Sequence, residues 1–424
     1  MKNAYIPALA ISALSVCLGA ENTPQQPAPA TKEAFSFNEW LPGRFKLFDA
    51  KRDHAENPWV QSVDFRFRPQ YQWSYMDPAG GADRVKGGSA GKGRRGNDEW
   101  RRFRLGGKAK VLNRITLFTD WDIGGLNQRY KYSNGQWNRS RGKTSVYELY
   151  AQADLKPVTL TLGKMKPAYI GEYRTSDSQI LTIERSNLVN QLTAEALYGI
   201  HLKNSDKKAK FGWETGVYVN GSHDDLWKSP AFNSATNAMA AVGLSYATSD
   251  KSRLYLDYMH SFYNEDRKLP VDVAEEGPGA RDIVALTWTT KRGNFSFMAE
   301  GMAGFNTPGA SGSKAGAENV AGISLIPSYK LSKHTEAVFR YQLAAGSNAV
   351  DAYSRYATTN SAYSSVSDAL QGFYFGVNYY VNPEKPDMMR VMLGAEYQCS
   401  SGKDATGAKG FTGWQYGAAL RANF

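Results

Sequence analysis

The chain ends in a stretch that decides its fold: Phe411-Thr412-Gly413-Trp414-Gln415-Tyr416-Gly417-Ala418-Ala419-Leu420-Arg421-Ala422-Asn423-Phe424. Residues two apart lie on the same face of a β-strand, so every second side chain can be grouped. The face that carries Trp414 and Phe424 is apolar, whereas the face that carries Gln415 and Arg421 is polar. This stretch therefore predicts an amphipathic strand that ends at the last residue.

The same alternation recurs upstream and predicts sixteen strands of similar length. Each is close to the roughly 9 to 11 residues that a tilted strand needs to cross a bilayer. The predicted strands are 59–75, 98–111, 113–125, 144–155, 157–166, 194–203, 209–220, 237–248, 251–263, 280–291, 293–304, 318–331, 333–345, 369–382, 386–399 and 411–424.

The connections between these strands alternate between very short and long. Membrane barrels join strands by tight periplasmic turns and longer extracellular loops, and an even number of strands returns the C-terminus to the periplasm. The sequence therefore predicts an all-β fold, a transmembrane antiparallel β-barrel of about sixteen strands. The long connections are 76–97, 126–143, 167–193, 221–236, 264–279, 305–317, 346–368 and 400–410.

The composition agrees with strands that have one apolar and one polar face. Aromatic residues make up 13% of the chain, yet the mean hydropathy is -0.50. Alternating faces average out in hydropathy, and Tyr and Trp favour the two membrane interfaces. A soluble β-sandwich is not expected to combine these features with long and short connections that alternate through eight hairpins.

The N-terminus predicts export. Lys2 precedes an apolar run over 4–20, and polar residues follow from Glu21. We expect a cleaved signal peptide over 1–20, a periplasmic leader over 21–58 and the barrel over 59–424. A lipoprotein anchored at Cys17 is the alternative at this end. Cleavage after Ala20 would leave Cys399 as the sole cysteine, without an intramolecular disulfide.

The formal charge of +11 favours anionic partners. For an exported chain these are small anionic or polar solutes and the phosphates of lipid and lipopolysaccharide, and nucleic acid is not expected. A basic cluster in the first long connection is either a solvated loop or a contact for lipopolysaccharide. It comprises Arg84, Lys86, Lys92, Arg94 and Arg95.

The sequence carries no pattern typical of an enzyme. The five histidines are scattered without the spacing of metal ligands, and neither a Gly-x-Ser-x-Gly elbow nor a phosphate-binding glycine loop occurs. We therefore predict no catalytic residue, no metal and no cofactor.

Charged residues on the polar faces predict two walls inside the barrel. Basic residues gather on the first two and last two strands, which become neighbours when the barrel closes: Arg66, Arg68, Arg102, Arg104, Lys108, Lys110, Arg390 and Arg421. Acidic residues gather elsewhere: Asp120, Asp122, Glu148, Asp154, Glu214, Asp257, Glu300, Glu336 and Glu396. These charges either line a path for ions or pair with one another, because charged rings confer selectivity only at a constriction.

The connection after the fifth strand holds the most specific pattern. The strand ends in Gly163 and Lys166, and the chain continues through Pro167, Gly171-Glu172 and Ser176 to Glu184-Arg185-Ser186. This arrangement resembles the phosphate-selective porin O/P family, and the resemblance covers 59–424. It implies a homotrimeric sixteen-stranded porin whose third extracellular loop folds into the lumen and whose basic residues form a ladder for anions.

On this sequence, the resemblance implies a ladder made of the basic wall, with Arg340 as a further member. The constriction loop would carry Lys166, Tyr169, Glu172, Arg174, Glu184 and Arg185, and a salt bridge between Glu184 and Arg185 is expected. The many carboxylates on the polar faces depart from a plain anion channel.

The leading functional hypothesis is an outer-membrane porin for passive diffusion of small solutes, favouring anions such as phosphate. The alternatives are a general or sugar-preferring porin and a plugged surface barrel that acts as an adhesin; an outer-membrane hydrolase is the weakest. Phe424 on the apolar face of the last strand resembles the C-terminal signal that the barrel-assembly machinery reads.

Overall fold

The computed structural model describes most of the chain downstream of the leader. The described residues are 45–51, 57–79, 96–123, 128–133, 136–141, 144–206, 208–219, 238–262, 280–307, 318–351, 366–402 and 410–424. The predicted signal peptide, most of the predicted leader and the basic cluster of the first long connection lie outside them. None of the helices in these ranges has the length and apolar character needed to cross a membrane.

All sixteen predicted strands are present. They are β2 (Val60–Pro78), β3 (Gly96–Val111), β4 (Ile115–Asp122), β7 (Ser145–Asp154), β8 (Val158–Met165), β9 (Leu197–Asn204), β10 (Phe211–Val219), β11 (Ala238–Ser249), β12 (Ser252–Ser261), β13 (Asp282–Arg292), β14 (Phe295–Thr307), β15 (Glu318–Lys330), β16 (Thr335–Asp351), β17 (Val366–Tyr380), β18 (Met389–Ser401) and β19 (Gly413–Ala422).

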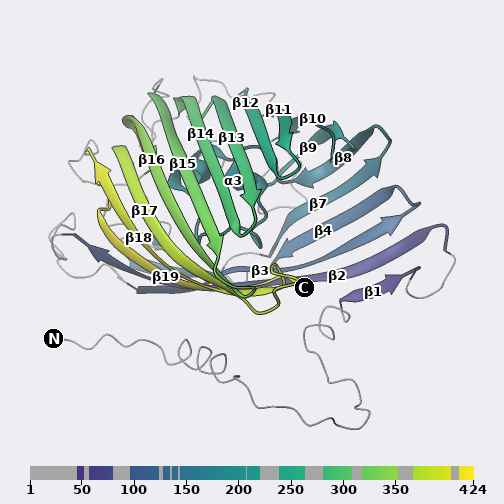
Figure 1. Cartoon of the computed structure of the whole chain (residues 1–424), viewed down its shortest axis with the longest axis horizontal. Coiled ribbons are helices and arrows are strands. Elements are labelled where there is room, and N and C mark those ends of the chain that lie inside the picture. Colours follow the sequence, from purple (N-terminus) through teal and green to yellow (C-terminus); the bar gives the residue numbers. More distant parts are fainter. Residues whose placement is uncertain are drawn as a thin grey trace, which may run out of the picture. The chain divides into compact units, whose positions relative to one another are not determined.

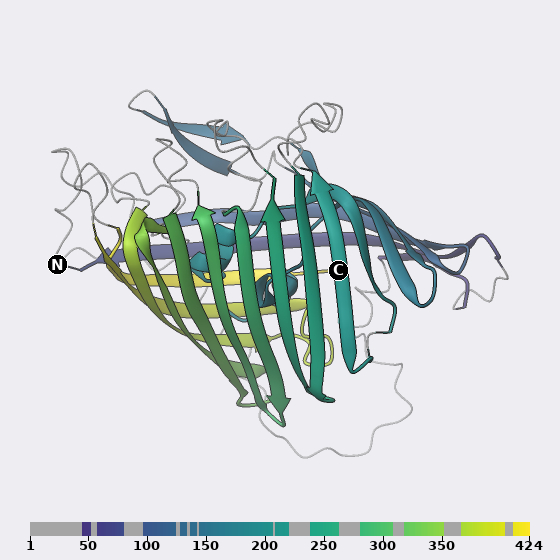
Figure 2. The ribbon, with the colours of Figure 1, turned by 90° about the horizontal axis from the view of Figure 1, so that it is seen from above.

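These strands close into an antiparallel barrel, visible in Figures 1 and 2. Each strand pairs with its neighbour in the chain, and β9 pairs with β10. The ring closes where β19 pairs with β2, with Leu420 opposite Tyr71 and Trp414 opposite Asp77. β18, β19, β2 and β3 are therefore adjacent, as predicted for the basic wall.

The connections alternate as predicted, which gives the barrel a short-turn end and a long-loop end. The turn between β3 and β4 spans 112–114 and the turn between β17 and β18 spans 381–388. The long connection 126–143 contains a separate hairpin that was not predicted, made of β5 (Gln128–Ser133) and β6 (Gln136–Arg141).

An extra strand, β1 (Lys46–Asp49), precedes the ring in the chain. It pairs with the start of β2, with Lys46 opposite Asp64, beyond the point where β19 ends. Phe45 stacks on Phe65 and on the terminal Phe424, with ring centroids 5.8 and 5.4 Å apart. Barrel structure thus begins upstream of Trp59 at this edge.

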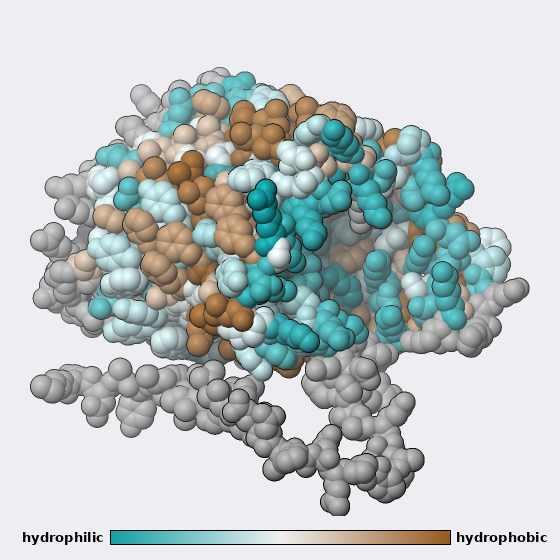
Figure 3. Space-filling model, in the orientation of Figure 1, coloured by the Kyte–Doolittle hydropathy of each residue, from teal (hydrophilic) through white to brown (hydrophobic). Residues whose placement is uncertain are grey.

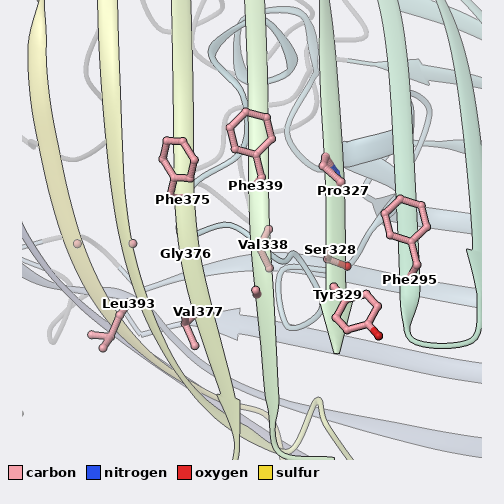
Figure 4. Close-up of a pocket in the computed structure, with 13 residues that line it drawn as sticks. Phe295, Pro327, Ser328, Tyr329, Val338, Phe339, Phe375, Gly376, Val377 and Leu393 are labelled. Atoms are coloured by element: carbon pink, nitrogen blue, oxygen red, sulfur yellow. The ribbon is translucent and has the colours of Figure 1, made fainter. Parts of the chain in front are cut away.

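The outward face of the barrel is apolar. Figure 4 shows Phe339 and Phe375 on adjacent strands, and their ring centroids lie 5.0 Å apart. They border a shallow groove of about 720 Å³ whose lining is almost entirely carbon. Phe375 is 54% exposed and Leu286 is 50% exposed, which would be unfavourable in water and suits the hydrocarbon of a bilayer.

The alternate side chains point inward, and on β2 and β19 they include polar residues, as predicted from their parity. On β2, Arg68, Gln70 and Gln72 are buried, whereas Phe65, which has the opposite parity, is exposed on the outside. The same holds on β19, where Arg421 is buried and Leu420 is exposed.

Candidate functional site in the barrel interior

Residues 166–196, which connect β8 to β9, lie against the inner wall and form the candidate site. They contain two short helices, α3 (Gly171–Arg174) and α4 (Asn187–Leu192). Ser186 caps α4, because its side chain accepts a hydrogen bond from the backbone N–H of Val189. Figure 1 shows α3 within the ring of strands. We call 166–196 the inner segment.

Apolar side chains hold the inner segment in place. Ile170, Ile183, Val189 and Leu192 have no exposed surface. They pack against inward-facing apolar residues of the wall, including Met239, Met259, Ile283, Met302 and Val320. Burial of each such side chain contributes roughly 1.5–3 kcal/mol, so the segment is a packed part of the barrel.

Asp177 is the point where the inner segment meets the basic wall. Its Oδ2 lies 3.0 Å from Nε of Arg102 and 3.5 Å from Nη1 of Arg104, both on β3. Its Oδ1 lies 2.7 Å from Nη2 of Arg185, which belongs to the segment itself. One carboxylate therefore engages three guanidinium groups.

Arg340 on β16 makes the most extensive contacts of any wall residue with the segment. Its Nη2 lies 3.0 and 3.1 Å from the two carboxylate oxygens of Glu396. Its Nη1 donates to the backbone oxygen of Glu184 at 2.6 Å and lies 3.5 Å from Oε1 of Glu172. With 1% of its surface exposed, Arg340 is fully enclosed by these partners.

Two further arginines of the wall bind backbone carbonyls of the segment. Arg390 donates to the oxygen of Ile180 at 2.5 Å. Arg421 donates to the oxygen of Asp177 at 2.8 Å and to the oxygen of Ile183. Because all the atoms involved are buried, these guanidinium groups are structural partners of the segment.

The other side of the segment meets acidic residues. Arg174 pairs with Glu214 of β10 and with Asp257 of β12. Asp257 also accepts the backbone N–H of Ile170 at 3.0 Å, and Glu300 of β14 accepts the backbone N–H of Gly171 at 2.5 Å.

The inner segment is thus complementary in charge to both walls. It offers Asp177 and Glu184 to the basic wall, and it offers Arg174 and two backbone N–H groups to the acidic wall. These pairs join the inner segment to residues on both walls. Figure 3 shows that the interior is hollowed and that hydrophilic residues border the hollow.

The other predicted ladder residues differ in their surroundings. Arg68 is 3.8 Å from Asp120, and Arg66 lies over the ring of Phe118 at 4.6 Å. Lys108 and Lys110 are exposed, and among the described residues neither forms an ion pair. They lie on the inner face near the short-turn end of β3.

The other predicted constriction residues all contact the barrel. Lys166 donates from Nζ to the backbone oxygen of Tyr173 at 2.6 Å, and its backbone N–H reaches Glu148 at 3.1 Å. Tyr169 is 1% exposed and packs edge-on to Tyr218. Glu172 accepts the backbone N–H of Ser186 at 3.0 Å.

One predicted contact is wrong. Glu184 does not pair with Arg185: its Oε1 lies 2.8 Å from Nε of Arg101, whereas Arg185 pairs with Asp177. Other partners hold the two side chains instead, Arg101 of β3 for Glu184 and Asp177 of the inner segment for Arg185.

Arg101 was missed because parity assigned it to the outward face. Gln70 pairs with Arg102 but the next residue, Tyr71, pairs with Trp100, so a β-bulge leaves Arg101 unopposed. The extra residue shifts the alternation by one, and Arg101 and Arg102 both face inward. The adjacent pair Arg101-Arg102, which strict alternation would place on opposite faces, was the only signal in the sequence.

Two carboxylates of the inner segment, Glu184 and Asp177, pair with arginines, so docking of the segment should weaken at low pH. Burial opposes the ionisation of Glu184, but the charge of Arg101 outweighs it and lowers the pKa of Glu184 to about 2. Burial likewise opposes the ionisation of Asp177, and the charges of Arg102 and Arg185 outweigh it and lower its pKa well below the ordinary value.

A carboxylate with a lowered pKa stabilises the folded state above its unfolded pKa, and this contribution is lost as pH falls through the folded pKa. We therefore expect the contribution of these two carboxylates to the unfolding temperature to stay constant above the ordinary carboxylate range, about pH 5, and to be lost progressively toward about pH 2. Glu184→Gln should remove part of this dependence. A loss of stability centred near pH 6 would contradict the assignment.

Comparison with known proteins places this geometry in context. The model of the family described as phosphate-selective porin O and P matches residues 75–253, which confirms the resemblance found in the sequence. A comparison with curated protein sequences returned no match.

Several solved structures share the fold. OmpF of Salmonella typhi, in complex with daunomycin, aligns with a TM-score of 0.54 at 13% identity, covering 86% of this chain and 98% of that one. An anion-selective porin from Comamonas acidovorans aligns at 0.52 and 10% identity, covering 86% and 99%. OmpT of Vibrio cholerae, in a trimer form, aligns at 0.50 and 11% identity, covering 85% and 99%.

Proposed function

We propose that this chain is an outer-membrane porin that lets small solutes diffuse through its interior past the inner segment. The observation that carries the proposal is a closed ring of strands with an apolar outside, a polar inside and a segment docked across it. The matched family model and the barrel fold support a porin channel in the outer membrane rather than an enzyme.

We further propose a weak preference for small anions such as phosphate, set by Arg66, Lys108 and Lys110. Charges confer selectivity when they face the passing solute. Most arginines of the basic wall are buried against carboxylates or backbone oxygens, whereas both lysines are exposed on the inner face. Of the basic ladder that the resemblance implies, only the residues near the short-turn end of the barrel would therefore act on a passing solute.

The double variant Lys108→Glu, Lys110→Glu is expected to shift permeation toward cations. Exposed charges are partly screened by salt, so we expect the anion-to-cation permeability ratio to fall by roughly threefold at low salt and less at high salt. Reversal potential in a salt gradient measures it. Lys251→Glu in an exposed turn is the matched control and should leave the ratio unchanged.

The decisive experiment on the function is single-channel recording of the purified protein in a planar bilayer, with phosphate titrated against chloride current. Conductance with anion preference and block by phosphate supports phosphate uptake. Large, weakly selective conductance supports a general porin or a sugar-preferring porin. Liposome swelling with oligosaccharides would separate these two.

A plugged barrel is the second candidate, because one observation favours it. The inner segment contacts strands on both sides of the ring and buries an apolar cluster, which is more than a narrow pore requires. Such a barrel would act at the surface, as an adhesin binding lipopolysaccharide or glycans. A folded protein that never conducts would establish this reading.

We also propose the routes of export and assembly that the sequence predicts. These are cleavage of a signal peptide after Ala20, recognition of Phe424 by the barrel-assembly machinery and association into a homotrimer. The packing of Phe424 against Phe45 and Phe67 is compatible with a terminal residue that is recognised before the barrel closes.

A further inference from the structure

Asp177 lies in a cluster of arginine side chains. Five arginines converge there, namely Arg101, Arg102, Arg104, Arg185 and Arg421, and the carboxylates that pair with four of them are Asp122, Asp177 and Glu184. The side chain of Asp177 is 6% exposed, and those of Arg104 and Arg185 are 5% exposed. The cluster is therefore a nearly dry site for negative charge.

The geometry of the cluster is that of a bound oxyanion. Arginine forks match carboxylate and phosphate oxygens, and several guanidinium groups around one small anion are typical of sites for such ligands. Here Arg102 and Arg104 reach one oxygen of Asp177 and Arg185 reaches the other. The carboxylate of Asp177 thus occupies the position of a bound anion, but it is covalently part of the chain.

The tether is a tight turn of the inner segment. The backbone N–H groups of Gln179 and Ile180 both donate to the oxygen of Ser176, and Asp177 lies at the tip that projects toward β3. Arg421 fixes the same tip by donating to the backbone oxygen of Asp177 at 2.8 Å. The carboxylate can thus be removed while the backbone retains a hydrogen bond to the wall.

Lys166 lies beside the same cluster, since Lys166 and Arg185 both lie over the ring of Tyr173, at 3.7 and 5.2 Å. Burial first, and then the charge of Arg185, lowers the pKa of Lys166 to about 7, and the charge of Asp177 acts in the opposite direction.

We propose that Arg102, Arg104 and Arg185 form a binding site for small oxyanions, carboxylate or phosphate, which the chain keeps occupied with its own Asp177. In the wild type this occupancy anchors the inner segment and withholds three arginines from passing anions. Removal of the carboxylate converts the anchor into a site for an external anion. This goes beyond the proposed channel and does not require conduction.

The test is chemical rescue of Asp177→Ala and Asp177→Asn in the purified full chain. Heat unfolding in detergent is measured at constant ionic strength while chloride is replaced by acetate or by inorganic phosphate. We expect both variants to unfold at lower temperature than the wild type in chloride, and acetate to restore the unfolding temperature of Asp177→Ala in a saturable way. The wild type should not respond.

Glu214→Ala is the matched control. It removes a carboxylate from the other wall, but Arg174 keeps Asp257 as its partner, so no oxyanion site is created. An equal response to acetate in this control, or no response in Asp177→Ala, would overturn the proposal.

Refolding yield is the second measurement, in case the variants fold poorly. A variant that refolds only when acetate or phosphate is present supports the site, and failure of both variants to refold under every condition overturns it. Because neither readout needs a current, a non-conducting wild type would refute the channel and leave this test intact. Rescue by acetate but not phosphate would define a carboxylate site, and the reverse a phosphate site.

Discussion

Arg340→Met is expected to destabilise the folded barrel by about 3–5 kcal/mol, the usual cost of removing one partner of a buried ion pair. Arg340 is 1% exposed, and its loss leaves Glu396 with a single amide partner, Gln342, in a buried environment. It also removes the donor to the backbone of Glu184, which ties the inner segment to β16. Equilibrium unfolding in urea measures the loss.

Arg253→Met is the control for Arg340→Met. Arg253 donates to Ser245 and to the backbone oxygen of Ala209 and has no carboxylate partner among the residues that the structure describes, so its loss should cost about 1 kcal/mol. Adding Glu396→Gln to Arg340→Met should recover part of the stability, because it removes the uncompensated charge. Equal losses in the two single variants would show that the ion pair contributes little.

The strands could be predicted from the sequence because their signal is local. Alternation with a period of two is written in consecutive residues, and it fixes both the strand and the face. The adjacency of the four strands that carry the basic wall could also be predicted, because closure of an antiparallel barrel brings the first strand beside the last. The strand β1 and the hairpin β5–β6 were missed, because they are short and lie in stretches interpreted as the leader and as a long connection.

The contacts of the site could not be predicted, because they join residues far apart in the chain. Asp177 meets Arg102 across a segment whose path depends on packing. The bulge at Arg101 appears only when two strands are paired. One signal was present but not used: Met239, Met259 and Met302 fall on inward faces, where a water-filled lumen would not place them. Apolar inward residues indicate that something packs inside.

The two walls differ in the number of side chains that attach the inner segment to them. A substitution at the acidic wall is therefore the more informative way to disturb docking of the segment. On the basic side, several arginines bind backbone oxygens of the inner segment. This attachment would therefore persist if any one side chain were removed. On the acidic side, Arg174 is the only side chain of the segment, among the described residues, that forms an ion pair with β10 or β12.

Arg174→Glu is therefore expected to detach the α3 end of the inner segment. The change places a third carboxylate beside Glu214 and Asp257, and repulsion replaces a partly buried pair whose loss alone costs about 3–5 kcal/mol. Single-channel conductance should rise, because the segment no longer spans the interior. Cleavage of 166–196 by added protease should increase too, since docked backbone is protected.

Arg174→Lys separates charge from geometry in this test. A lysine keeps the positive charge but cannot fork between two carboxylates, so conductance should stay close to wild type with modestly weaker docking. Replacing Glu214 and Asp257 by their amides in the Arg174→Glu background should restore protection, because the repulsion disappears. Unchanged conductance together with unchanged protection in Arg174→Glu would mean that apolar packing of Ile170 and Leu192 alone holds the segment, and that the charges of the two walls serve the solute instead.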